Sequence, residues 1–180
     1  MLWNLDPTHA NVDFSVKHLA ISTVRGSFKS FTATGATNED GVPTAMSMEI
    51  DVASINTDNT QRDGHLRSAD FFDAEKFPKI TFKATKITGT ARDLTVVGDL
   101  TIRDVTKPLT LKGDLAKAIK DPWGLQRTSL SLTGKISRSE WGLTWNQALE
   151  FGGVVVSDDV KLQIEAEAVA VVEEKEAFAV

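Results

Sequence analysis

Apolar and polar residues alternate over eight segments of this chain, and turn signals separate most of them. In the first segment Val12, Phe14 and Val16 alternate with Asp13 and Lys17. A period of two places the apolar set on one face of a strand and leaves the other face to water. The segments are 12–18, 26–34, 46–52, 79–88, 94–102, 109–115, 130–136 and 160–168. Helical patterns do not alternate with them, so we expect an all-β antiparallel sheet, folded as a barrel or a sandwich.

Strand length favours the barrel. Several segments extend to about ten residues, against about five or six in a typical strand, and a closed sheet protects long strands because it has no edges. Gly98, Gly113 and Gly134 share the apolar face, where we expect them to leave volume, although each could instead mark a bulge or bend. The prediction is an eight-stranded antiparallel barrel, a size that either fills its interior or holds one small ligand.

Length and composition limit the other possibilities. The 180 residues fit one domain, expected over 1–172, with 173–180 as a frayed tail. A net charge of −5 argues against nucleic acid as a partner and against a polybasic membrane anchor. No apolar run is long enough to cross a membrane, so membrane insertion is not expected. The absence of cysteine excludes disulfides and thiolate sites.

The N-terminus lacks the basic and apolar regions of a secretory signal, because Asp6 and Pro7 follow almost at once. We therefore expect a cytoplasmic protein, or a periplasmic one if a signal has been removed.

Residues 57–82 interrupt the strands with a dense block of charges and paired aromatics. A short helix is expected here, capped by Asp58, as an insert between the third and fourth strands at the mouth of the barrel. Two interpretations stay open. The helix is either a solvated surface element with weak ion pairs, or it presents Arg62, His65 or Arg67 to a polar head group.

The sequence lacks the common catalytic and metal-binding motifs. The three histidines lack metal-ligand spacing, and there is no nucleophile elbow or glycine-rich phosphate loop. No catalytic residue, metal or cofactor is predicted. The chain has nine phenylalanines, four tryptophans and no tyrosine, which would suit a hydrocarbon guest better than a sugar or nucleotide, although core packing is the commoner use of aromatics.

Six motifs, in order, resemble the YceI-like family of polyisoprenoid-binding, lipocalin-like barrel proteins. They are W-x-L-D-P-x-H with V-x-F-x-V-K-H-L, S-T-V-R-G-S-F, R-D-x-H-L-R-S-x-D-F-F-D, K-F-P-x-I-T-F, L-T-I-R-D-V-T-K-P-L-T-L and W-G-L-T-W-N, at 3–19, 22–28, 62–73, 76–82, 100–111 and 141–146. The resemblance extends from Trp3 to about Val169. It implies an elongated, lipocalin-like, eight-stranded antiparallel barrel around an apolar tunnel that holds an isoprenoid, quinone-like or fatty-acid-derived amphiphile. It also implies a homodimer.

The leading hypothesis is therefore non-enzymatic binding, storage or transport of such a lipid. Alternation predicts the tunnel lining as Phe14, Val16, His18, Met48, Ile50, Phe82, Val96, Ile102, Leu111, Leu132 and Ile164. Two alternatives remain. One is an enzyme acting on a prenyl or acyl lipid, with His65 and Asp63 as acid and base. The other is a filled barrel that serves as a protein-interaction module.

Overall fold

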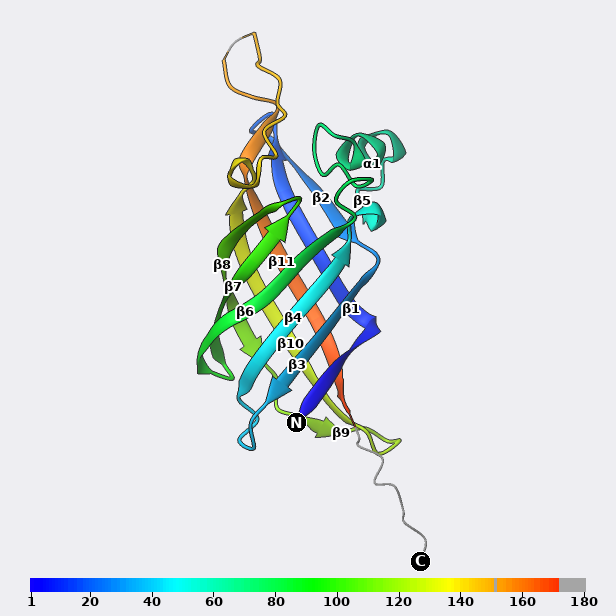
Figure 1. The fold of residues 1–180 in the computed structure, drawn as a ribbon, viewed down its shortest axis with the longest axis vertical. Coiled ribbons are helices and arrows are strands. Elements are labelled where there is room, and N and C mark those ends of the chain that lie inside the picture. The colour runs from blue at the N-terminus through cyan, green and yellow to red at the C-terminus, as the bar shows by residue number, and fades with distance from the viewer. Residues whose placement is uncertain (151, 172–180) are drawn as a thin grey trace, which may run out of the picture.

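The structure, a computed structural model, describes residues 1–150 and 152–171. These residues form a long antiparallel barrel with one short α-helix near one end (Figure 1). The expected frayed tail, residues 173–180, lies outside the described residues. The strands are β1 (Leu2–His18), β2 (Ser22–Phe28), β3 (Phe31–Thr37), β4 (Pro43–Asp51), β5 (Ile55–Asn56), β6 (Lys79–Thr90), β7 (Asp93–Ile102), β8 (Val105–Leu115), β9 (Ile119–Lys120), β10 (Gln126–Ser137) and β11 (Val156–Ala170). The helices are α1 (Thr60–Arg67) and two 3₁₀ turns, η1 (Val52–Ser54) and η2 (Arg138–Trp141).

The eleven strands occupy eight positions around the barrel. β2 and β3 share one position, because β2 pairs with the second half of β1 and β3 with its first residues. β5 and β9 are two-residue additions to β2 and β10. Pairing of β1 with β11 closes the ring, which otherwise runs β11-β10-β8-β7-β6-β4-β3. The prediction of an eight-stranded antiparallel barrel with a helix between its third and fourth strands is thus confirmed.

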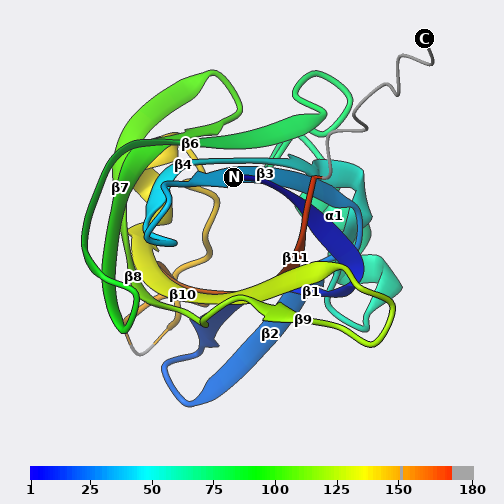
Figure 2. The ribbon, with the colours of Figure 1, turned by 90° about the horizontal axis from the view of Figure 1, so that it is seen from below.

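The two ends of the barrel differ in what lies over them. α1, η2 and the segment that follows η2 all lie at one end, called here the α1 end (Figure 1). The first residues of β1, the last of β11 and the β9 hairpin lie at the far end. Seen from the far end, no described helix or strand crosses the interior of the barrel (Figure 2).

β1 begins ten residues earlier than alternation predicts, at Leu2. Between Asp6 and Ala10 the chain bulges, and the residues between them have no partner on β11. The bulge changes the parity of the strand, because an odd number of extra residues turns the following side chains over. Trp3 before the bulge and Val12 after it therefore both face the interior, and both are buried.

The prediction that Gly98, Gly113 and Gly134 leave empty volume inside the barrel is wrong. Neighbouring atoms already fill the space beside each glycine. A Cβ atom on Gly98 would meet the Phe82 ring, and one on Gly134 would meet Leu111. A Cβ atom on Gly113 would collide with the backbone oxygen of Ser131 on β10. These glycines permit close approach of strands and rings rather than leaving a hollow. Gly98 also lies beside a bulge in β6, which was the alternative interpretation.

Candidate ligand-binding cavity

A cavity of about 250 Å³ runs inside the barrel and is lined by apolar side chains from all eight strand positions. Packed protein interiors leave few voids larger than a water molecule, so this space is not a packing defect. The predicted lining residues in its wall are Phe14, Val16, Met48, Ile50, Phe82, Ile102, Leu111, Leu132 and Ile164. Contact of these side chains with a ligand stays a prediction.

Two predicted lining residues lie outside the wall. Val96 on β7 is fully buried and packs in the solid part of the core. His18 is the last residue of β1, where it pairs with Ser22 and Val156 and is partly exposed. Val96 has the predicted inward direction, but the cavity meets β7 only further along the strand, at Leu100 and Ile102.

The α1 end of the cavity is lined by side chains that the alternation pattern could not assign. Leu66 of α1, Phe71 and Phe72 after it, and Leu143 after η2 all line the cavity there. Phe72 packs edge-on against the Phe28 ring, with centroids 6.1 Å apart. The insert thus covers this end of the barrel with apolar groups.

His65 joins the insert to the segment after η2. Its ring meets Phe71 edge-on at 5.1 Å and Trp145 edge-on at 4.7 Å between centroids. Its Nε2 atom lies 2.8 Å from a carboxylate oxygen of Asp70. These contacts hold the imidazole at the α1 end, and His65 is not among the cavity-lining residues.

The insert is anchored through Thr57. The carboxylate of Asp63, a buried group, accepts hydrogen bonds from the Thr57 N–H at 2.9 Å and the Thr57 hydroxyl at 2.6 Å. Arg62 donates to the same hydroxyl from Nε and to the Thr57 carbonyl from Nη2, each at 2.8 Å. The weak ion pairs expected on the helix are not seen for its arginines, since the described residues show no Arg62 or Arg67 ion pair.

The helix cap also differs from the prediction. Asn59, not Asp58, is the N-cap, and its side chain accepts the Arg62 N–H at 2.9 Å. Asp58 has a φ of 58°, whereas an N-cap residue requires an extended backbone. Neither Arg62 nor Arg67 lines the cavity. Head-group contact by Arg62, His65 or Arg67 therefore stays a prediction, confined to the outer surface of this end.

Arg138 is a buried cation at the α1 end, in the wall of the cavity, that the sequence analysis missed. Its Nε donates to the Ser157 carbonyl at 3.0 Å, and its Nη1 donates to the carbonyls of Leu143 and Trp145. Burial lowers the pKa of this guanidinium, and the charge of Asp158 opposes that effect. The bonds show that Arg138 fastens the segment after η2 over the barrel.

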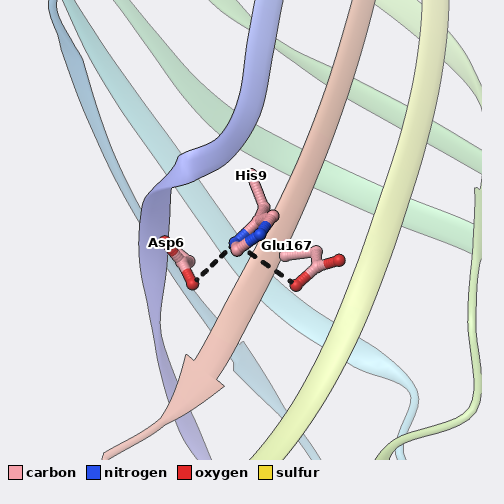
Figure 3. Close-up of side chains that lie close together, drawn as sticks. All are labelled: Asp6, His9 and Glu167. Atoms are coloured by element: carbon pink, nitrogen blue, oxygen red, sulfur yellow. Dashed lines mark hydrogen bonds and ion pairs between the residues drawn. The ribbon is translucent and has the colours of Figure 1, made fainter.

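At the far end Asp6, His9 and Glu167 gather beside the β1 bulge (Figure 3). His9 Nδ1 lies 3.2 Å from Asp6 and 3.9 Å from Glu167. Three such groups can hold a metal ion, but Arg127 already lies 2.7 Å from Asp6 and 3.6 Å from Glu167. A guanidinium at that distance neutralises the carboxylates and repels a cation, so the geometry is that of an ion-pair network.

The fold and the cavity together define a class of protein, a closed eight-stranded antiparallel barrel with one short helix and an apolar interior space. Residues 3–168 match the model of the YceI-like domain family. The UPF0312 proteins of Staphylococcus aureus strains bovine RF122 and USA300 are each 40% identical to this chain, over 92% of it and 95% of the relative. The chain belongs to the YceI-like family.

Solved structures share the barrel. The YCEI protein of Campylobacter jejuni superimposes with a TM-score of 0.76 and 34% identity, covering 87% of this chain and 90% of its own. BcnA of Burkholderia cenocepacia gives a TM-score of 0.78 at 21% identity, over 91% and 98%. A polyisoprenoid binding domain from Saccharophagus degradans gives 0.68 at 16%, over 94% and 98%. The last two likenesses concern the fold alone.

Proposed function

We propose that this protein binds a long-chain isoprenoid or similar amphiphilic lipid inside the barrel, without chemical change, and stores or transports it. The observation that carries the proposal is the apolar wall, which extends from Phe71 at the α1 end to Trp3 and Ala168 at the far end. In another protein an apolar cavity of about 150 Å³ stays dry and binds benzene or xenon. A hydrocarbon chain has the chemistry that this wall accommodates.

Affinity would then depend mainly on chain length. Burying a methylene group contributes about 0.8 kcal/mol, and the costs of association and of ordering the chain are subtracted from the total. Apolar side chains make up most of the wall, and the guanidinium of Arg138 within it is committed to backbone carbonyls. We therefore expect loose selectivity for the chain and a head group that lies at an end of the cavity.

The likeness to the Saccharophagus degradans domain supports the isoprenoid class, since that protein is described as polyisoprenoid binding. Family membership supports a binding role. The enzyme alternative has little support, because the Asp63 carboxylate is occupied by Thr57 while His65 lies against Asp70. Homodimer formation and the cellular compartment stay predictions.

Native mass spectrometry of the purified protein tests the proposal, followed by solvent extraction and lipid analysis of the same sample. The protein is then mixed with prenols and fatty-acid amides of increasing chain length. We expect a stoichiometric adduct, either co-purified or formed on addition, and binding that strengthens with chain length. Protein that carries no lipid and rejects both series would overturn the proposal and favour the protein-interaction module.

A further inference from the structure

We propose that the far end of the barrel docks on the surface of a lipid bilayer through a rim of exposed apolar side chains. This apolar rim consists of Met1, Leu2, Val42, Ile119, Trp123, Leu125 and Val171. The proposal deepens the proposed function, because it names the source from which a hydrocarbon ligand would enter. Docking can be measured without any ligand, so the two proposals can fail separately.

The exposure of these side chains is high. Trp123 is 82% exposed, Ile119 65% and Leu2 59%. Among the described residues, the other large apolar side chains with comparable exposure are Ile21 and Val154, both at the α1 end. Single exposed apolar residues are ordinary, but a group gathered at one end marks an interaction surface.

The rim is continuous because its members lie on neighbouring strands. The backbone N–H of Val171 donates to the Leu2 carbonyl at 2.8 Å. The α-amino group of Met1 donates to the end of β3, next to the turn that carries Val42. On the other side β11 pairs with β10, and β10 pairs with β9, which holds Ile119. Figure 1 shows these segments together at the lower end of the barrel.

Trp123 stands at the tip of a rigid hairpin. The carboxylate of Asp121 accepts the backbone N–H groups of Trp123 and Leu125, each at 2.9 Å. The same carboxylate pairs with Arg127 Nε at 2.8 Å. Because three hydrogen-bond donors hold the Asp121 carboxylate and the turn, the backbone that carries the indole has little conformational entropy left to lose on binding. Tryptophan, with an apolar ring and a polar N–H, favours the membrane–water interface.

Charge at the hairpin complements lipid phosphates. Lys117 and Lys120 are exposed beside the turn, and the Lys120 side chain lies 3.6 Å from the position of a Cβ on Gly124. The one acidic group of the hairpin, Asp121, is already paired with Arg127. Two lysines flanking an exposed tryptophan can contact phosphates while the ring reaches the acyl boundary. The other exposed acidic residues at this end lie on other segments, with Glu39 and Asp40 on the turn between β3 and β4, Asp93 at the start of β7 and Asp114 near the end of β8. Asp6 and Glu167 lie beside the guanidinium of Arg127.

The position of the rim favours a bilayer over a second copy of the chain. The cavity reaches the last residues of the strands here, with Thr37, Pro43 and Leu115 in its wall. A bilayer in contact with the rim would let a lipid chain pass into the cavity without crossing water. Such transfer needs a surface contact only, and none of the described helices is both long and apolar enough to span a membrane.

Co-sedimentation with phosphatidylcholine vesicles tests the docking, repeated with phosphatidylglycerol added. We expect the wild-type protein to sediment with both, more strongly with the anionic lipid. The double substitution Ile119→Ser and Trp123→Ser removes two exposed apolar groups and is expected to weaken partitioning at least about tenfold. Ile21→Ser is the matched control, because Ile21 is also 82% exposed but lies at the α1 end; its partitioning should equal that of wild type.

Tryptophan emission gives a second readout in the same samples. Trp3 and Trp141 are buried and Trp145 is partly buried, so a blue shift on vesicle addition would report Trp123. We expect the shift in wild type and its loss in Trp123→Phe, which should still sediment. The proposal is overturned if wild type does not bind vesicles or if Ile21→Ser loses binding as much as the rim variant. It is also overturned if the rim variant abolishes only self-association, which would assign the rim to a second copy.

Discussion

The guanidinium of Arg127 lies 2.7 Å from the carboxylate of Asp6, although 121 residues separate them in the sequence. β11 stands between their strands, so this ion pair reaches across one strand of the barrel. Arg127 also pairs with Asp121 at 2.8 Å. One side chain thus ties the bulge of β1 to the hairpin that carries Trp123.

This network predicts a loss of stability in acid. The hydroxyl of Thr8, then Arg127 and His9, hold the pKa of Asp6 well below its usual range, and Arg127 lowers that of Asp121. A carboxyl whose pKa is lower in the folded state stabilises the fold above its unfolded pKa and loses this contribution as the pH falls towards the folded value. The thermal midpoint should therefore decline between about pH 5 and about pH 2.

The substitution Asp6→Asn tests the assignment. It removes the titrating group, so its thermal midpoint should be lower than that of wild type at neutral pH and should depend less on pH below 5. Asp159→Asn is the control, since Asp159 forms an exposed pair with Lys135 and such pairs contribute little. An equally steep acid dependence in Asp6→Asn would show that other groups control the transition.

Arg138→Leu should destabilise the protein. The change leaves the carbonyls of Leu143, Trp145 and Ser157 without their donor at a site that is 6% exposed. We expect a loss of about 3 kcal/mol in the free energy of unfolding, measured by urea denaturation. Arg92→Leu, at an exposed position, should change it by less than about 0.5 kcal/mol. Similar values for the two variants would contradict the anchoring role.

Two glycine substitutions should have opposite effects. Gly113→Ala would drive a Cβ into the Ser131 oxygen and is expected to cost more than about 2 kcal/mol, because the β8–β10 pairing must open. Gly64 lies inside α1 with nothing within 4 Å of a Cβ. Gly64→Ala should stabilise by about 0.5–1 kcal/mol. Urea denaturation measures both, and a stable Gly113→Ala protein would contradict the close approach of the strands.

Alternation predicted most of the barrel, because each long strand has one buried and one wet face. Alternation does not predict side-chain direction across a bulge or break, because the inward-facing residues change there between odd and even positions. Trp3 and Leu5 face the cavity from odd positions, whereas Val12 and Phe14 face it from even ones. No local sequence signal predicts how many residues the bulge between them contains. The alternation from Val12 onward is visible in the sequence, but only pairing with β11 shows that residues 2–6 belong to the same strand and face the interior from odd positions.

The residues that line the α1 end of the cavity could not be predicted for a different reason. Leu66 and Phe71 belong to an insert with no strand period, and the direction of their side chains is set by tertiary packing. Arg138 could have been found from the sequence. It lies at an even position, as do the inward-facing Leu132 and Ile136 of β10, and it directly follows the end of that strand. A charge on an apolar stripe indicates a buried polar contact.

The most direct test of the lipid-binding account is a matched pair of substitutions on β11. Ala166→Phe places a ring inside the cavity, whereas Gln163→Phe places one on the outer face of the same strand. Each variant, after a check that its thermal midpoint is retained, is titrated with a long-chain prenol by calorimetry. The account predicts that wild type and Gln163→Phe bind with similar affinity and that Ala166→Phe binds at least about tenfold more weakly. Equal binding by both variants would contradict the placement of the lipid inside the barrel.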